Sequence, residues 1–302
     1  MKSPILHIGY PKTATKWFQN EFYPNVSGVY PVMRKDLFDR LVFTDIYSYS
    51  PSHFRGWITG EAGSKRLIIC DEILVGGLDI GFGNGEFVLL MSQRLHDTFP
   101  DSQVVILIRN QHTALESAYS HYVMAGGTYS PSRFLGIKPM FIKPYMGYNQ
   151  FSTKLFEYDK LIDLYISLFG KDKVHIFLYE DFAENPNRFI ALFCNTLQLD
   201  APQGQTLNRL NARYSYIALQ IQRFLNRFAL GNTPFKQYFI NFPSIYKISR
   251  SLILATDKYC SFPKYKFDKK VHHWVELRFK ESNQCLSQWV SKEKLLRWGY
   301  PL

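Results

Sequence analysis

Residues 5–17 of this 302-residue chain decide its fold and read ILHIGYPKTATKW. The apolar run at residues 5–9 predicts a buried strand, and the amphipathic stretch after the quoted residues predicts a helix. Lys12, Thr13 and Thr15 fall where that helix begins. Unpaired N–H groups and the positive end of the helix macrodipole favour an anion at such a place. The stretch therefore predicts a strand, an anion-binding loop and a helix.

The loop is not a Walker A sequence, which needs a second glycine directly before its lysine. Here Gly9 stands three residues before Lys12. The loop resembles instead the Pro-Lys-Ser/Thr-Gly-Thr-Thr loop of sulfotransferases, which binds 3′-phosphoadenosine 5′-phosphosulfate (PAPS). Ala14 replaces the usual glycine and Lys16 the second threonine. Alanine keeps the backbone N–H, but a positive φ at this position would strain it.

A second segment follows the apolar run at residues 103–108, which predicts a strand buried on both faces of a parallel sheet. Arg109 comes directly after it. Thr113 and Glu116 have capping-box spacing, so we expect a helix to begin near Thr113 and to carry Ser117. Arg109 and Ser117 together resemble the 3′-phosphate element of the same family.

The resemblance implies a PAPS-dependent sulfotransferase whose co-substrate is held by these two segments. The implied PAPS-binding residues are Lys12, Thr13, Ala14, Thr15, Lys16, Trp17, Arg109 and Ser117. Among them, Thr13 and Thr15 would hold the 5′ end of PAPS, and Trp17 would flank the adenine. The planar donor fork of Arg109 suits a phosphate, and Lys12 would also stabilise the departing phosphate oxygen. Each segment alone also has a plain structural interpretation. The loop is then a solvated helix start, and the arginine and serine cap a strand and pack in a helix.

A third short apolar run ends at Glu72. Lys12, Glu72 and Arg109 thus each follow a predicted strand, and in open α/β sheets the carboxyl edge forms the ligand crevice. Glu72 is the candidate general base, because glycan-modifying members of the family use a glutamate. The same analogy favours a carbohydrate or glycan acceptor. His53 and His121 remain alternative bases.

The mechanism that the resemblance implies is in-line attack of an acceptor hydroxyl on the sulfur of PAPS. We expect no essential metal, because a transferring sulfuryl group carries less negative charge than a phosphoryl group. Two other functions are consistent with these residues. A P-loop kinase-like phosphotransferase would share the strand, loop and helix, and a non-catalytic polyanion-binding protein would use the basic C-terminal half. Nucleic acid is not an expected partner.

The late basic segment is either a solvated face or a site for an acidic glycan or a nucleic acid. Its basic residues alternate with aromatic ones and are Lys264, Lys266, Lys269, Lys270, His272 and His273. We assign the loop-like residues 126–151 to the acceptor cleft. Arg213 is the candidate for a later contact with the 3′-phosphate.

Residues 173–179 predict a fourth strand, followed by structural acids at Glu180 and Asp181. Asn185 and Pro186 then predict the cap and first turn of a helix through Leu197. Further downstream, Ser215 is expected to begin a helix, and residues 283–300 to form terminal helices.

The expected fold class is α/β, with a P-loop-like three-layer fold, a central parallel sheet flanked by helices and a helical C-terminal region. We expect one sulfotransferase domain over residues 1–302, with a PAPS-binding core at 1–200 and the helical part at 201–302. The hydrophobic content of 46% excludes general disorder.

The charge and the remaining composition fit a soluble enzyme. The formal net charge of +11 creates an attractive field for anions. No stretch is long enough to span a bilayer, and the first strand leaves no room for a signal peptide, so we expect a cytoplasmic protein. The four cysteines lack metal-type spacing, and we expect them to be reduced.

Overall fold

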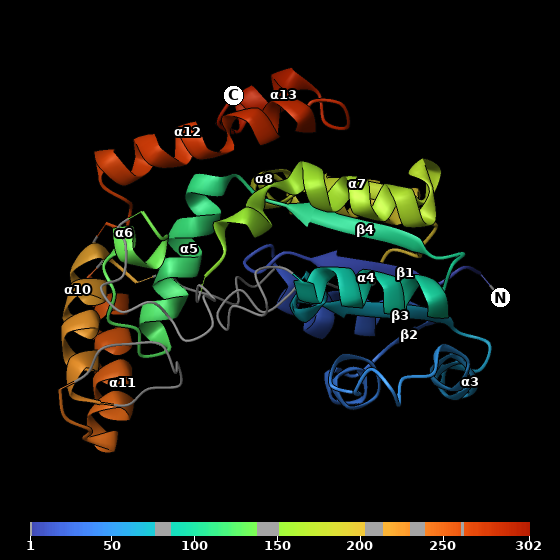
Figure 1. Cartoon of the computed structure of the whole chain (residues 1–302), viewed down its shortest axis with the longest axis horizontal. Coiled ribbons are helices and arrows are strands. Elements are labelled where there is room, and N and C mark those ends of the chain that lie inside the picture. Colours follow the sequence, from blue (N-terminus) through green and yellow to red (C-terminus); the bar gives the residue numbers. More distant parts are fainter. Residues whose placement is uncertain (1, 76–85, 138–150, 203–213, 230–238, 261–262) are drawn as a thin grey trace.

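The fold is a three-layer α/β arrangement around one parallel sheet (Figure 1). The computed structural model describes residues 2–75, 86–137, 151–202, 214–229, 239–260 and 263–302. Within these ranges the sheet has the strand order β2-β3-β1-β4-β5, and all pairs are parallel. The strands are β1 (Ile5–Gly9), β2 (Val29–Pro31), β3 (Arg66–Asp71), β4 (Gln103–Ile108) and β5 (Val174–Leu178).

Helices make up the other two layers and the C-terminal region. The core helices are α1 (Thr15–Trp17), α2 (Arg34–Leu37), α3 (Pro51–Ala62), α4 (Glu86–Thr98), α5 (Gln111–Met124), α6 (Pro131–Phe134), α7 (Tyr158–Phe169), α8 (Tyr179–Glu184) and α9 (Pro186–Leu197). The later helices are α10 (Tyr216–Leu225), α11 (Pro243–Cys260), α12 (Lys269–Leu286) and α13 (Lys292–Arg297). Short π or 3-10 turns that matter below are η1 (Phe18–Phe22), η3 (Phe38–Val42) and η4 (Glu72–Val75).

The strands are buried on both faces because their side chains alternate between two core clusters. Leu6 and Ile8 of β1 belong to a large cluster that includes residues of α3, α4 and α7. Ile5 belongs to a second cluster, which is rich in aromatic rings from η1 and α9. Helices therefore cover both faces, as the apolar strand sequences predict.

The C-terminal helices extend the fold beyond the sheet. Figure 1 shows α10 and α11 side by side at one end of the molecule, next to α5, and α12 and α13 along another side. Among the described residues, no helix is both long enough and apolar enough to cross a membrane.

Most of the expected elements are confirmed. The four predicted strands are present, the side chain of Asn185 caps α9, and Ser215 caps α10. β2 was not expected, and the basic late segment is partly helical because α12 begins at Lys269. Before α12, Tyr265 and Phe267 are buried while the lysines beside them are exposed. The alternating aromatic residues therefore belong to the core.

Candidate active site

The loop after β1 turns tightly, and its shape depends on Gly9. A Cβ atom added at Gly9 would lie 2.4 Å from Thr15 Oγ1 and 3.1 Å from Thr15 Cγ2. Only glycine therefore lets the end of β1 approach the start of α1. Lys12 and Ala14 have φ angles of 71° and 66°, in the left-handed region that L-residues rarely adopt. Strained backbone of this kind is concentrated at ligand-binding sites.

The threonine side chains fold back onto this loop. Thr13 Oγ1 donates a hydrogen bond to the Tyr10 carbonyl at 2.5 Å, and Thr15 Oγ1 donates to the same oxygen at 3.4 Å. Lys16 is exposed, whereas Trp17 is buried within the second core cluster. The threonines thus shape the loop. Their contacts with the 5′ end of PAPS, and that of Trp17 with the adenine, stay predictions.

Arg109 follows β4 and contacts the loop directly. Its Nη1 donates to the Lys12 carbonyl at 2.8 Å, and its Nε donates to Thr113 Oγ1 at 2.9 Å. The guanidinium carbon lies 4.4 Å from the centroid of the Tyr179 ring, and the Tyr158 hydroxyl donates to the Arg109 carbonyl at 2.5 Å. A guanidinium has five N–H donors, so these two bonds leave three for an anion.

The helix after Arg109 begins earlier than predicted. Asn110 is the N-cap of α5, because its side chain accepts a hydrogen bond from the second helical residue, and the helix starts at Gln111 rather than Thr113. The predicted capping box is wrong. Glu116 is buried and its Oε1 accepts instead from the backbone N–H of Phe267, at 3.0 Å.

Ser117 nevertheless lies on the face of α5 that begins beside Arg109. Thr113, Ser117 and His121 are spaced by four residues and share one face of the helix. Thr113 contacts Arg109, and Ser117 is half-buried one turn further on. The contact of Ser117 with a 3′-phosphate stays a prediction. His121 lies another turn away, on a helix that extends past the end of the sheet (Figure 1).

Two acidic residues end β3 and differ in their surroundings. Asp71 is fully buried and accepts hydrogen bonds from Ile73 N at 2.8 Å and Gln19 Nε2 at 3.0 Å. It also pairs with Arg34 at 3.3 Å, and its burial raises the pKa of this carboxyl. Glu72 begins η4 and is half-buried. The hydrogen bonds and ion pair of Asp71 therefore give it a structural role, whereas Glu72 is half-buried just after the end of β3.

The sheet brings the three segments that carry these candidate residues to one edge, as the parallel strands predict. β1 lies between β3 and β4, so Glu72, Lys12 and Arg109 follow the carboxyl ends of three adjacent strands. Asp71 is the register partner of Ile8, which puts Glu72 beside the end of β1. The hydrogen bond between Arg109 and the Lys12 carbonyl shows direct contact between two of the three segments.

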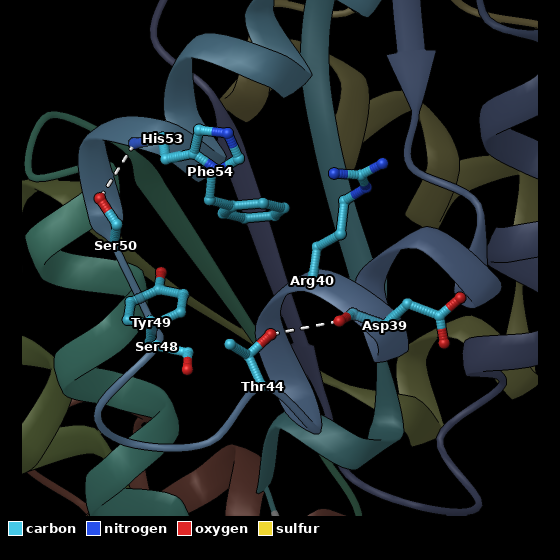
Figure 2. Close-up of a pocket in the computed structure, with 8 residues that line it drawn as sticks. All are labelled: Asp39, Arg40, Thr44, Ser48, Tyr49, Ser50, His53 and Phe54. Carbon is cyan, nitrogen blue, oxygen red and sulfur yellow. Dashed lines mark hydrogen bonds between the residues drawn. The ribbon is translucent and has the colours of Figure 1, made fainter.

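His53 lies in a different part of the molecule. Figure 2 shows it at a pocket between η3 and α3. The pocket has a volume of about 190 Å³. The pocket is lined by Asp39, Arg40, Thr44, Ser48, Tyr49, Ser50, His53 and Phe54. Figure 1 shows α3 toward the end of the sheet opposite α5, so the fold does not bring His53 to Arg109.

The C-terminal segment holds the start of α5, which no sequence pattern indicated. Asn110 Nδ2 donates to the Trp298 carbonyl at 2.8 Å. Glu180 accepts from Asn110 N at 2.9 Å and from the Tyr300 hydroxyl at 3.1 Å, and burial raises its pKa. Asp181 accepts from Trp298 Nε1 at 3.0 Å. Both acids therefore make structural contacts, and their having no catalytic role stays a prediction.

The segment assigned to the acceptor cleft is described only in part. Residues 138–150 lie outside the described residues, as does Arg213. In the described part, the Phe134 ring lies 4.2 Å from that of Phe151 and 4.9 Å from that of Tyr122, between centroids. These aromatic side chains anchor the ends of the segment to α5, and its contact with an acceptor stays a prediction.

One group of described residues has the composition of a metal site. Ligand atoms of His112, His272 and Glu276 lie within 4.8 Å of one another. However, the two imidazole rings stack at 3.7 Å between centroids, with planes inclined by 13°. Nearly parallel rings do not direct their nitrogen lone pairs at one point about 2 Å from each, as a shared metal requires. The group is a stacked histidine pair, and we assign no metal to it.

No protein-family model and no curated protein matches this chain. A solved sulfotransferase from Alicyclobacillus acidocaldarius matches 70% of it and 87% of its own length, with 18% identity and a TM-score of 0.50. A mouse sulfotransferase complexed with 3′-phosphoadenosine 5′-phosphate (PAP) aligns over 98% of this chain and 88% of its own, with 13% identity and a TM-score of 0.40. A sulfotransferase domain from the curacin biosynthetic pathway aligns over 95% of this chain and 97% of its own length, with 12% identity and a TM-score of 0.38. The chain therefore shares the fold of the Alicyclobacillus sulfotransferase.

Proposed function

We propose that this protein is a PAPS-dependent sulfotransferase that moves a sulfuryl group to an acceptor hydroxyl. One observation carries the proposal: Arg109 Nη1 donates to the Lys12 carbonyl at 2.8 Å. The two residues are far apart in the sequence and belong to the two segments that resemble PAPS-binding elements. Their contact supports one continuous anion-binding surface, on a fold that a solved sulfotransferase shares.

The two ends of the co-substrate have separate ligands in this proposal. The Lys12 ammonium and the N–H groups at the start of α1 hold the 5′-phosphosulfate, as helix starts suit anions. The three remaining donors of Arg109, with the Ser117 hydroxyl, hold the 3′-phosphate. The guanidinium of Arg109 lies over the Tyr179 ring, and this contact fixes its orientation.

Glu72 is the proposed general base. Its carboxylate takes the proton of the acceptor hydroxyl as the acceptor oxygen forms a bond to sulfur. The bond from sulfur to the 5′-phosphate oxygen breaks, PAP leaves, and Lys12 stabilises the charge on that oxygen. Asp71 is less suited because it is fully buried and bonded to Gln19. His53 lies at a different pocket.

The proposed acceptor is a carbohydrate hydroxyl. Support comes from the carboxylate candidate base, which resembles that of glycan-modifying sulfotransferases. The net charge of +11 would also attract an acidic glycan.

Calorimetric titration with PAP and with adenosine 5′-phosphate, which lacks the 3′-phosphate, tests the proposal. We expect PAP to bind at least tenfold more tightly, and Arg109→Ala to abolish the difference. Ser117→Ala is a second variant that leaves the contact between Arg109 and the loop in place. Arg55→Ala is the matched control, because Arg55 is an exposed arginine on α3.

The alternatives predict different titrations. A kinase-like phosphotransferase would bind ATP in preference to PAP and would need Mg²⁺. A polyanion-binding protein would show no nucleotide site, and its affinity for a polyanion would fall steeply with salt. Either result, with folded protein, would reject the sulfotransferase proposal.

A further inference from the structure

The segment before α12 has an unusual charge. Residues 201–256 contain seven lysines or arginines and no aspartate or glutamate. Among its described residues, Arg227 is exposed and Arg223 and Arg250 are half-buried. The remaining 246 residues hold all 25 acidic side chains of the chain. One of them, Asp257 of α11, accepts from Ser215 N at 2.8 Å, so the positive charge of the segment is only partly balanced nearby.

The same segment exposes apolar side chains on α10. Ile217, Ile221 and Phe224 follow helical spacing along one face and are 47–55% exposed. The opposite face is buried, where Leu219 packs in the core and Gln222 bonds to Asn226. α10 is therefore apolar on a face that the rest of the described chain does not cover.

The exposed apolar surface continues beyond α10. Phe239, Ile240 and Phe242 are 51–73% exposed, and Ile248 and Leu252 of α11 have exposed fractions of 58% and 64%. Of the 17 exposed large hydrophobic residues among those described, nine lie between positions 216 and 252. Such a concentration of exposed apolar side chains marks an interaction site rather than ordinary surface.

The two helices form one unit that is fixed to the catalytic part of the fold. Gln222 Nε2 of α10 donates to Ser249 Oγ of α11 at 3.2 Å. Asn226 Nδ2 donates to the carbonyls of Val123 and Gly127 at 2.8 and 2.9 Å, which ties α10 to the end of α5. Figure 1 shows this unit at one extremity of the molecule, where a flat partner can reach it.

We propose that the α10–α11 unit docks the protein on the surface of an anionic lipid bilayer. Interfacial helices bury large apolar side chains at the boundary of head groups and acyl chains, while lysines and arginines meet anionic head groups. Both features occur in this unit. The docking proposal does not depend on sulfuryl transfer.

Charge and exposed apolar side chains argue against two other occupants of this surface, a second copy of the protein and a nucleic acid. A second copy of this surface would bring Arg223, Arg227 and Arg250 toward the same side chains. Asp257, the acidic residue of the described α10–α11 unit, already accepts from Ser215 N, so like charges oppose such pairing. A nucleic acid would match the charge but would leave Phe224, Phe239 and Phe242 without an apolar environment. An anionic bilayer offers negative charge to the basic residues and an apolar environment to the exposed apolar side chains.

Co-sedimentation of the full chain with lipid vesicles tests docking. One set contains phosphatidylcholine alone, and the other contains one third phosphatidylglycerol. We expect at least tenfold stronger partitioning onto the anionic vesicles, which 0.5 M salt weakens. The double variant Ile221→Ser/Phe224→Ser should lose at least tenfold. Leu277→Ser and Leu192→Ser are controls, because they remove equally exposed apolar side chains on α12 and α9.

Other outcomes would overturn the proposal. One is equal loss in the control variants, and another is the absence of partitioning in wild type. A concentration-dependent dimer in analytical ultracentrifugation that Ile221→Ser/Phe224→Ser abolishes would assign the surface to self-association. Binding to an RNA oligomer but not to vesicles would assign it to nucleic acid. PAP titration of the same variant reports separately on the proposed function, since neither residue belongs to the candidate active site.

Discussion

The close approach of Gly9 to Thr15 predicts a specific non-additivity in stability. Gly9→Ala would place a Cβ atom 2.4 Å from Thr15 Oγ1 and 3.1 Å from Thr15 Cγ2. Thr15 is 3% exposed, so its side chain has little room to move. We expect Gly9→Ala to lower the free energy of unfolding by about 1–3 kcal/mol, the usual cost of overpacking a core site.

Removing the side-chain atoms of Thr15 beyond Cβ should relieve most of this cost. In a Thr15→Ala background the nearest atom to the new methyl group is Thr15 Cβ, at 3.3 Å, which a small shift accommodates. Gly9→Ala should then cost less than about 1 kcal/mol, and the coupling energy of the double-mutant cycle should be about 1–2 kcal/mol. The pair would thus behave as one contact.

Urea unfolding followed by far-UV circular dichroism measures all four free energies. Gly60→Ala is the control, because Gly60 lies in α3 and the added methyl group would meet no atom within 4 Å apart from its chain neighbours and the helix's own backbone. It should be neutral or stabilising by up to about 1 kcal/mol. If the Gly9→Ala and Thr15→Ala effects add within about 0.5 kcal/mol, the close approach does not govern the loop and our account of it is wrong.

Three further predictions concern stability and can be measured by urea unfolding. Ala14→Gly should raise the free energy of unfolding by about 0.5–1 kcal/mol. At a φ of 66° the strain energy of alanine in the folded state exceeds the entropy that glycine adds to the unfolded chain. Burial lowers the pKa of His7 to about 3 from 6.5, so stability should fall by about 1.4 kcal/mol per pH unit from pH 6.5 toward 4, and less steeply in His7→Leu. Asn110→Ala should cost about 1–2 kcal/mol through loss of the α5 cap and of the bond to Trp298.

The central sheet was predictable because its strands carry their own signal. Strands such as Gln103–Ile108 are apolar at almost every position, which is typical of burial on both faces of a parallel sheet. β2 was missed because Val29–Pro31 has only three residues and ends in proline, a residue that normally argues against a strand. Within the described part of the chain it pairs only with β3, at the edge of the sheet, where a proline is tolerated.

The candidate site was predictable where one segment determines it, and not where distant contacts do. The loop after β1 and the position of Arg109 follow from local sequence. The start of α5 does not, because Asn110 competes with Thr113 for the cap and local spacing does not decide between them. The bond from Asn110 to Trp298 joins positions 188 residues apart, and no periodicity reports such a contact.

The contact between Arg109 and the Lys12 carbonyl means that the two proposed phosphate sites are not independent. Lys12 and Ala14 hold strained φ angles, and a strained loop persists only when its surroundings fix it. Arg109 is one of those fixed surroundings, because its carbonyl is held by Tyr158 at the same time. Loss of its side chain therefore removes the proposed 3′-phosphate ligand and also frees the loop that is proposed to hold the 5′ end. Arg109→Ala should for this reason weaken even adenosine 5′-phosphate, whereas Ser117→Ala should weaken only ligands that carry a 3′-phosphate.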